Sequence, residues 1–342
     1  MSLPSTAISA EDIAASPAWF PLEPAGPAAM RLVRIDETAY RGASFLDRRL
    51  LQAGPQETRV DSAMLATAAA TLAPRAHYIF HIGHVGSTLI SRLLGECAGF
   101  FALREPALLR ELAVRPAQSR VVAAVGLRDA LALLARTWHP EQRALVKATS
   151  FASELAEPAL GMDSGASAVL MFSPALAYLR CILGGPNSRV EAKALAPSRL
   201  ARLRGRLGEA APDVEPQSEG QWIAMSWLCE MACLQQAAAR FGSRVLWVDF
   251  DAFLAAPQAG LEAIVRRLAA EPAPGEIARI LAGPLMRRYS KAPEHAYDAA
   301  LRREVLAGAD LEHGMEIQRG MHWLASLGGR HPLIDAVLRE RI

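Results

Sequence analysis

A glycine-containing turn followed by two hydroxyl residues is the part of this sequence best suited to bind an anion. The segment reads His81-Ile82-Gly83-His84-Val85-Gly86-Ser87-Thr88-Leu89 and joins an apolar run to a helical pattern. Glycine lets a backbone approach a ligand closely, and the N–H groups and dipole at a helix start attract negative charge. An ordinary N-capped helix can carry the same letters, but the strand–turn–helix context favours binding. We therefore predict that phosphate or sulfate binds at Gly83, His84, Val85, Gly86, Ser87 and Thr88.

The turn departs from the Walker A loop of nucleoside-triphosphate hydrolases and kinases. That motif requires G-x-x-x-x-G-K-[ST], whereas His81 stands at its first glycine and Ser87 at its lysine. An enzyme without that lysine lacks its main contact to the terminal phosphates. An atypical kinase or nucleotidase is therefore a rival interpretation only.

The elements that must position this turn alternate between strands and helices. Short apolar runs predict core strands at Tyr78–Ile82, Phe100–Leu103, Ala144–Ala148, Ala168–Phe172 and Val245–Phe250, with a weaker strand at Arg31–Ile35. Helical patterns lie at Phe45–Gln52, Asp61–Leu72, Ser87–Leu94, Leu108–Ala113, Arg128–Trp138, Trp222–Phe241 and Leu261–Leu268. This alternation predicts an α/β fold with a five-stranded parallel sheet between helices, a three-layer arrangement. Ligands of such sheets bind beyond the carboxyl ends of the strands.

The chain of 342 residues fits one large α/β domain. We expect an N-terminal extension over 1–75, a core over 76–290 and a helical C-terminal tail over 291–342. Residues 1–27 are rich in Ala, Pro and Ser and predict an arm or a loosely packed lead-in.

Composition and charge exclude several classes of protein. The net charge of +2 argues against sequence-independent nucleic-acid binding. The N-terminus does not resemble a signal peptide, and Arg128 and Asp129 interrupt the most apolar stretch, so we expect no membrane span and a cytoplasmic protein. The four cysteines form no C-x-x-C pair and predict reduced, buried thiols.

Three segments together resemble the sulfotransferase family. Gly83–Leu89 is similar to its phosphosulfate-binding loop, with His84 at the usual Lys or Arg position. Arg244–Pro257, with Asp249-Phe250-Asp251, is similar to the family's fifth strand and its acidic-aromatic-acidic continuation. Phe101–Pro106 resembles the acidic loop after the second strand in several bacterial and tyrosyl-protein sulfotransferases. The resemblance covers residues 77–270, and it rests on the order and spacing of these three segments.

The resemblance implies a P-loop-type fold, the donor 3′-phosphoadenosine 5′-phosphosulfate, no essential metal, and sulfuryl transfer to a hydroxyl or amine. One feature of the family is missing here, the Arg at the end of the fourth strand. In the family this Arg and a Ser about eight residues further on hold the 3′-phosphate of the donor. Here the strand runs into Ser173, and the nearest arginine is Arg180. We predict donor contacts from Ser173 and Arg180, with further charge from residues 189–206 or from Arg287, Arg288 and Lys291.

Three residues are candidates for the chemistry of transfer. Glu105 is the candidate general base, although a Glu at a helix start before Pro106 is also simply favoured by the dipole. His84, when protonated, would stabilise the leaving phosphate. Lys147 is placed at the anion site, in preference to a structural ion pair, and Arg104 would orient the acceptor or neutralise Glu105. Asp249 and Asp251 are expected to cap the next segment.

Other features have two interpretations each. Residues 289–297 form either a lid or a surface loop, and the arginines of 189–206 have the spacing of a solvated helix face. The loss of the fourth-strand Arg also leaves open a degenerate anion-binding protein without catalysis. The acceptor is unknown, and the Ala- and Leu-rich helices leave room for a homodimer interface.

Overall fold

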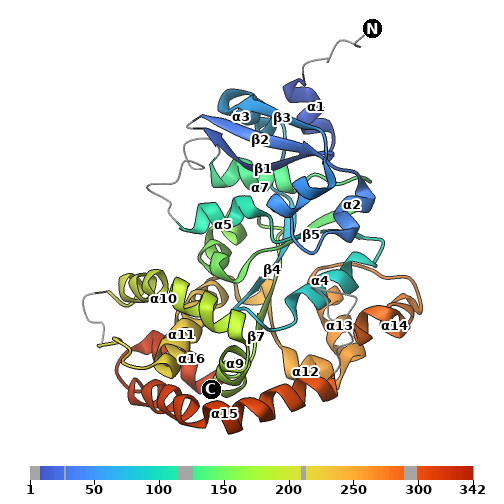
Figure 1. Cartoon of the computed structure of the whole chain (residues 1–342). Coiled ribbons are helices and arrows are strands. Elements are labelled where there is room, and N and C mark those ends of the chain that lie inside the picture. The colour runs from blue at the N-terminus through green and yellow to red at the C-terminus, as the bar shows by residue number, and fades with distance from the viewer. Residues whose placement is uncertain (1–7, 27, 115–125, 209–212, 289–298, 342) are drawn as a thin grey trace.

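A five-stranded parallel sheet forms the centre of the molecule (Figure 1). The computed structural model describes residues 8–26, 28–114, 126–208, 213–288 and 299–341. The strand order is β5-β6-β4-β7-β8, and every neighbouring pair is parallel. The strands are β4 (Ala76–His81), β5 (Phe100–Arg104), β6 (Arg143–Lys147), β7 (Ala168–Phe172) and β8 (Val245–Asp249). All five predicted core strands are therefore confirmed.

The register of the sheet brings the candidate loops to one edge. Arg104 pairs with Lys147, and Phe172 pairs with Asp249. β4, β5 and β7 are buried along their whole length, as expected for strands covered on both faces. The loops after β4, β5, β6 and β7 consequently start side by side.

Helices cover both faces of this sheet, which confirms the predicted three-layer α/β fold. On one face lie α4 (Ser87–Gly95) and α13 (Pro257–Arg267), which follow β4 and β8. On the other lies α11 (Glu219–Phe241), which begins at the cap Ser218 and is surrounded by other helices. Its neighbours are η2 (Ser150–Leu155), α8 (Ala156–Met162), α9 (Ala175–Leu183), α10 (Pro186–Leu207), α15 (Ala299–Ser326) and α16 (Pro332–Arg341). In Figure 1 the red helix α15 runs along the base of the molecule, away from the N-terminal sheet.

The N-terminal segment forms a second, antiparallel sheet. Its order is β1-β2-β3, from β1 (Trp19–Gly26), β2 (Ala29–Arg34) and β3 (Glu57–Asp61), flanked by α1 (Ala10–Ala15) and α3 (Ser62–Ala70). Phe20 and Leu22 of β1 are buried, so the expectation of an arm is wrong for residues 8–26. The buried guanidinium of Arg136 donates to the carbonyls of Ser16 and Trp19, at 2.7 and 2.9 Å. These hydrogen bonds attach the N-terminal segment to the core. The weak periodicity of its sequence does not reveal this attachment.

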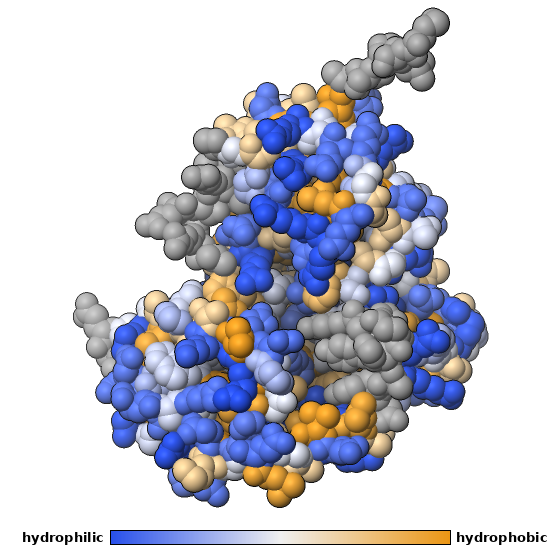
Figure 2. All heavy atoms as spheres, in the orientation of Figure 1, coloured by the Kyte–Doolittle hydropathy of each residue, from blue (hydrophilic) through white to orange (hydrophobic). Residues whose placement is uncertain are grey.

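Short elements complete the chain and differ modestly from prediction. Phe45–Gln52 was expected to be a helix, and the structure has the 3-10 helix η1 (Arg48–Ala53) there. The remaining elements are α2 (Glu37–Gly42), α5 (Ala107–Val114), α7 (Leu127–Leu134), η3 (Gly242–Arg244), α12 (Phe250–Ala255), α14 (Glu276–Ala282) and η4 (Pro284–Arg287). The expected domain boundaries and homodimer stay predictions. On the face shown in Figure 2, apolar side chains lie in separate patches among hydrophilic ones.

Within the described ranges, no helix combines the length and apolarity that a membrane span requires. All four cysteines are free thiols, and Cys97, Cys229 and Cys233 are buried.

Candidate functional site

The turn after β4 adopts a conformation that depends on its glycines. Gly83, His84 and Gly86 all have positive φ, at 94°, 56° and 63°. A Cβ on Gly86 would lie only 1.9 Å from the ring of Phe250, so no other residue fits without displacing that ring. The turn is thus packed closely between α12 and the start of α4, where the helical N–H groups are oriented for an anion.

His81 holds this turn through both ring nitrogens. Its Nδ1 accepts the N–H of Gly83 at 3.1 Å, and its Nε2 lies 2.9 Å from the Ala148 carbonyl. Since a carbonyl can only accept, the proton is on Nε2 and the ring is the Nε2–H tautomer. Nothing in the sequence indicates this role, because His81 stands out there only as a mismatch to the Walker A motif.

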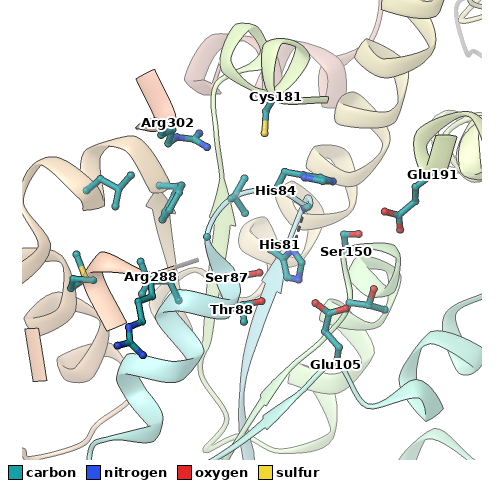
Figure 3. A pocket seen from close by; sticks show the side chains of 18 residues that line it. His81, His84, Ser87, Thr88, Glu105, Ser150, Cys181, Glu191, Arg288 and Arg302 are labelled. Carbon is teal, nitrogen blue, oxygen red and sulfur yellow. Dashed lines mark hydrogen bonds between the residues drawn. The ribbon is translucent and has the colours of Figure 1, made fainter. Parts of the chain in front are cut away.

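A cavity opens above the turn, at the carboxyl edge of the sheet (Figure 3). Its lining includes Gly83, His84, Val85, Gly86, Ser87 and Thr88, all six residues predicted for the anion-binding turn. The Thr88 side chain is buried, and its Oγ1 has no hydrogen-bond partner among the described residues. A buried hydroxyl without a partner costs free energy, so Thr88 is well suited to donate to a ligand.

Glu105 lies at the opposite side of this cavity from the arginines (Figure 3). It has φ of 49°, and its N–H donates to the Lys147 carbonyl at 2.8 Å. Its carboxylate forms an ion pair with the Lys147 ammonium. The Lys147 side chain is fully buried and is not part of the cavity lining. From the sequence we expected Lys147 to contact the anion directly. The structure instead has the alternative, an ion pair between Lys147 and Glu105.

Arg104 points away from the cavity, which corrects the expectation that it orients an acceptor. Its guanidinium donates to the carbonyls of Tyr40, Arg41 and Ala43 at 2.6–2.7 Å. Burial, aided by nearby Arg92 and Arg41, lowers the pKa of Arg104 to about 10. Successive residues of a strand face opposite sides, so Arg104 anchors the N-terminal segment while Glu105 faces the cavity.

Two arginines, Arg302 and Arg288, line the other side of the cavity. The Arg302 side chain is 4% exposed and donates to Asp251, with Nε 2.6 Å from Oδ1. Its Nη2 also lies 3.5 Å from the Ser173 hydroxyl, and its guanidinium stacks 5.0 Å over the Phe250 ring. Arg302 was not predicted, because an arginine near the start of a polar helix looks like a solvated side chain.

The remaining residues predicted to contact the donor are more dispersed. The Ser173 hydroxyl lies 3.5 Å from Arg302 and Ser173 is absent from the cavity lining, while its carbonyl accepts the Trp227 Nε1–H at 3.0 Å. Arg180 is also absent from the lining and binds Asp310 on α15 at 2.7 Å. Arg287 is exposed and outside the lining. Lys291 and the candidate lid at 289–297 lie outside the described residues.

Asp249 has the structural role that was predicted. Its carboxylate caps α12 by accepting the Asp251 N–H at 2.8 Å. Asp251 has a further contact, because its carboxylate holds Arg302 as described above.

The basic stretch 189–206 is not simply a solvated face. Arg199 and Arg202 bind Glu230, whose side chain is fully buried, at 2.8 and 3.1 Å. Arg202 also binds Glu154 at 2.7 Å, and Arg206 forms a second ion pair with Glu154. Helical spacing alone could not reveal that the acids lie on η2 and α11.

Of the comparisons with known proteins, only the comparison with solved structures gives matches. No protein-family model matches the chain, and no curated protein gives a significant match. A sulfotransferase domain from the curacin biosynthetic pathway is 14% identical, with 78% of this chain and 95% of that chain covered and a TM-score of 0.44. The mouse sulfotransferase SULT7A1 complexed with PAP is 9% identical, with 81% and 93% covered and a TM-score of 0.42. A sulfotransferase domain from the Synechococcus PCC 7002 olefin synthase is 13% identical, with 72% and 94% covered and a TM-score of 0.39. All three of these solved structures are described as sulfotransferases or sulfotransferase domains.

Proposed function

We propose that this chain transfers a sulfuryl group from 3′-phosphoadenosine 5′-phosphosulfate to a hydroxyl or amine of a small acceptor. The observation that best supports the proposal is how hydrogen-bond donors, arginines and a carboxylate are distributed around one cavity. The start of α4 lies at its centre, Arg288 and Arg302 line one side, and Glu105 lies on the other (Figure 3). A donor with two anionic ends and an acceptor that must lose a proton require this combination.

The centre of the cavity suits the phosphosulfate. The backbone N–H groups at the start of α4 and the hydroxyls of Ser87 and Thr88 supply donors there. Both side chains are buried, at 5% and 3% exposure, and the Thr88 hydroxyl has no partner within the described ranges. A bound phosphate or sulfate oxygen would satisfy it.

Arg302 is suited to bind the donor's 3′-phosphate in place of the missing fourth-strand arginine. It comes from α15, far along the chain, yet its guanidinium lies against Ser173 at the end of β7. Its partner Asp251 is 40% exposed at the side chain, so Asp251 can be solvated when a phosphate competes for the guanidinium. Arg288 adds a second positive charge to the same side.

The reaction assigns each group one role. The acceptor oxygen attacks sulfur while the S–O bond to the 5′-phosphate breaks, and the acceptor proton passes to the Glu105 carboxylate. The products are the sulfated acceptor, 3′-phosphoadenosine 5′-phosphate and one proton, later released from Glu105. Charge develops on the leaving phosphate, where the α4 N-terminus and the ring of His84 stabilise it.

Thermal melting tests the donor directly. We expect 3′-phosphoadenosine 5′-phosphate to raise the melting temperature more than adenosine 5′-phosphate or ATP with magnesium. At about 100 times its dissociation constant, a ligand stabilises a fold by about 2.7 kcal/mol. A preference for ATP with magnesium would instead support a kinase or nucleotidase, and no shift with any nucleotide would overturn the proposal. Binding of the bisphosphate without turnover of the sulfated donor would identify a degenerate binding protein.

A further inference from the structure

The strand β4 carries a buried histidine near each end, and the two rings make the same kind of hydrogen bond. His77 and His81 are each 4% exposed, and residues four apart in a strand lie on the same face. The Nδ1 of His77 accepts the N–H of Ser167, and the Nδ1 of His81 accepts the N–H of Gly83, both at 3.1 Å. Of the two histidines, His81 lines the donor cavity and His77 does not.

The Ala148 carbonyl determines which nitrogen of the His81 ring carries the proton. This carbonyl lies 2.9 Å from Nε2 and can only accept, so Nε2 is the donor. In a neutral imidazole the other nitrogen is then an acceptor, and Nδ1 faces the Gly83 N–H (Figure 3). With the proton on Nδ1 instead, two N–H groups would face each other and the carbonyl would face a lone pair. The residue after β6 thus fixes the ring in the tautomer that can hold the turn.

The turn needs such support because its backbone is strained. Gly83, His84 and Gly86 have positive φ. For a residue with a side chain, such as His84, this conformation costs free energy and persists only when neighbouring groups enforce it. The His81 bond acts on the residue directly before His84. Gly83 is also packed against Ser150, because an added Cβ would lie 3.3 Å from the Ser150 Cβ. The orientation of the turn, and with it that of the N–H groups at the start of α4, therefore depends on these contacts.

We propose that His81 is a positioning residue for the sulfuryl donor. The Ala148 carbonyl keeps its proton on Nε2, and the lone pair of Nδ1 holds Gly83, so that the turn has its anion-binding conformation before a ligand arrives. Preorganisation of this kind raises affinity, because the ligand does not have to order the turn itself. The inference deepens the proposed function, on which it rests for the identity of the donor, and it requires no contact between His81 and the ligand.

Three variants test the inference. Asn carries its side-chain oxygen at the same bond separation from Cβ as the Nδ1 of His, so His81→Asn still accepts from Gly83. Gln carries its amide nitrogen at the separation of Nε2, so His81→Gln donates to Ala148 but leaves Gly83 without its acceptor. His77→Gln is the matched control, because it removes the same kind of bond from the same strand, away from the cavity. Isothermal titration calorimetry with 3′-phosphoadenosine 5′-phosphate and with inorganic phosphate measures affinity, and thermal melting measures stability.

We expect His81→Gln to bind both ligands about tenfold more weakly, equivalent to about 1.4 kcal/mol and within the range of one hydrogen bond. His81→Asn should stay within about threefold of wild type, half of that free energy. His77→Gln should lower the melting temperature without changing either affinity. Wild-type affinities in His81→Gln, or equal losses in His81→Asn and His81→Gln, would overturn the inference, as would an equal loss in His77→Gln.

Nitrogen-15 NMR of the wild-type protein tests the tautomer without any substitution. We expect an unprotonated Nδ1 in His81 with a scalar coupling to the Gly83 amide nitrogen, both with and without 3′-phosphoadenosine 5′-phosphate. A proton on Nδ1 would contradict the inference even where a variant does not fold.

The two ligands separate this inference from the proposed function. If wild type binds inorganic phosphate, with the expected loss in His81→Gln, but does not prefer 3′-phosphoadenosine 5′-phosphate over adenosine 5′-phosphate, the proposed donor is wrong and the positioning role of His81 stands. If the bisphosphate is preferred and His81→Gln binds it as wild type does, the donor stands and the positioning role is wrong. Absence of binding of either ligand to wild type would overturn both.

Discussion

Two of the regions that bury arginines pair them with carboxylates, and they do so in different ways. Between α10, α11 and η2, three arginines surround Glu154 and Glu230, which we call the paired cluster. At the cavity, Arg302 forms an ion pair with Asp251 and makes a long contact with Ser173. Glu230 is fully buried at its side chain, whereas Asp251 is 40% exposed.

This difference separates a structural cation from one that can exchange partners. A fully buried carboxylate cannot give up its arginine, because it would remain charged without solvent or partner. An exposed carboxylate can return to water when a phosphate arrives. The number of arginines in a region therefore does not indicate whether it binds an anion. The solvent exposure of the carboxylate that pairs with each arginine is the better indicator. The predictions below test this contrast, from the largest expected effect to the smallest.

Removal of the buried charge should have the largest effect. Glu230→Gln leaves Arg199 buried without its carboxylate and leaves Arg202 with Glu154 alone. Breaking such a buried pair costs about 3–5 kcal/mol. Urea denaturation measures the loss in the free energy of unfolding. Glu215→Gln is the control, because its partner Arg204 is half exposed, and we expect a loss below about 1 kcal/mol. Equal losses in the two variants would contradict a structural role for the cluster.

Acid should weaken the paired cluster within a defined pH range. Burial alone would raise the pKa of Glu154, but Arg202 and Arg206 outweigh it and lower the pKa to about 2, from 4.5. A carboxyl with a lowered pKa stabilises the fold fully above pH 4.5, and this stability is lost as the pH falls towards 2. The shift corresponds to up to about 3 kcal/mol. Denaturation of wild type and Glu154→Gln from pH 6 to pH 2.5 should therefore converge on acidification. A constant difference between them would contradict this prediction.

The contrast also shows how far the sequence could predict the molecule. The core strands and the glycine turn between β4 and α4 were predictable, because uninterrupted apolar runs and a glycine turn before Ser87 depend on local order only. The partners of Arg104, Lys147 and Arg302 were not, because each comes from a segment distant in the sequence. β1 was missed because its prolines and short alternation resemble a loop, while its burial depends on packing against β2 and α5.

At the cavity, substitution of Arg302 should change how strongly the protein prefers a nucleotide with a 3′-phosphate over one without it. Arg302→Ala should weaken binding of 3′-phosphoadenosine 5′-phosphate by about 2 kcal/mol, roughly thirtyfold, since it removes a charge-assisted hydrogen bond to the 3′-phosphate. Binding of adenosine 5′-phosphate, which lacks that phosphate, should change little. Isothermal titration calorimetry measures both affinities.

Two variants sharpen this test. Arg302→Lys keeps the positive charge but loses the planar, two-pronged donor, so we expect an intermediate affinity. An equal loss for both nucleotides in Arg302→Ala would mean that Arg302 supports the cavity without contacting the 3′-phosphate.

The smallest effect is expected at the exposed end of the basic stretch. Arg189 binds Glu219 at 2.7 Å, with both side chains 39% exposed, and such a surface pair contributes below about 1 kcal/mol. Arg189 lines the groove beside Trp222, away from the donor cavity. Arg189→Ala should therefore leave both the free energy of unfolding and the affinity for 3′-phosphoadenosine 5′-phosphate nearly unchanged. A clear loss of affinity would show that residues 189–206 supply charge to the donor after all, and would remove the distinction between arginines with buried and with exposed partners.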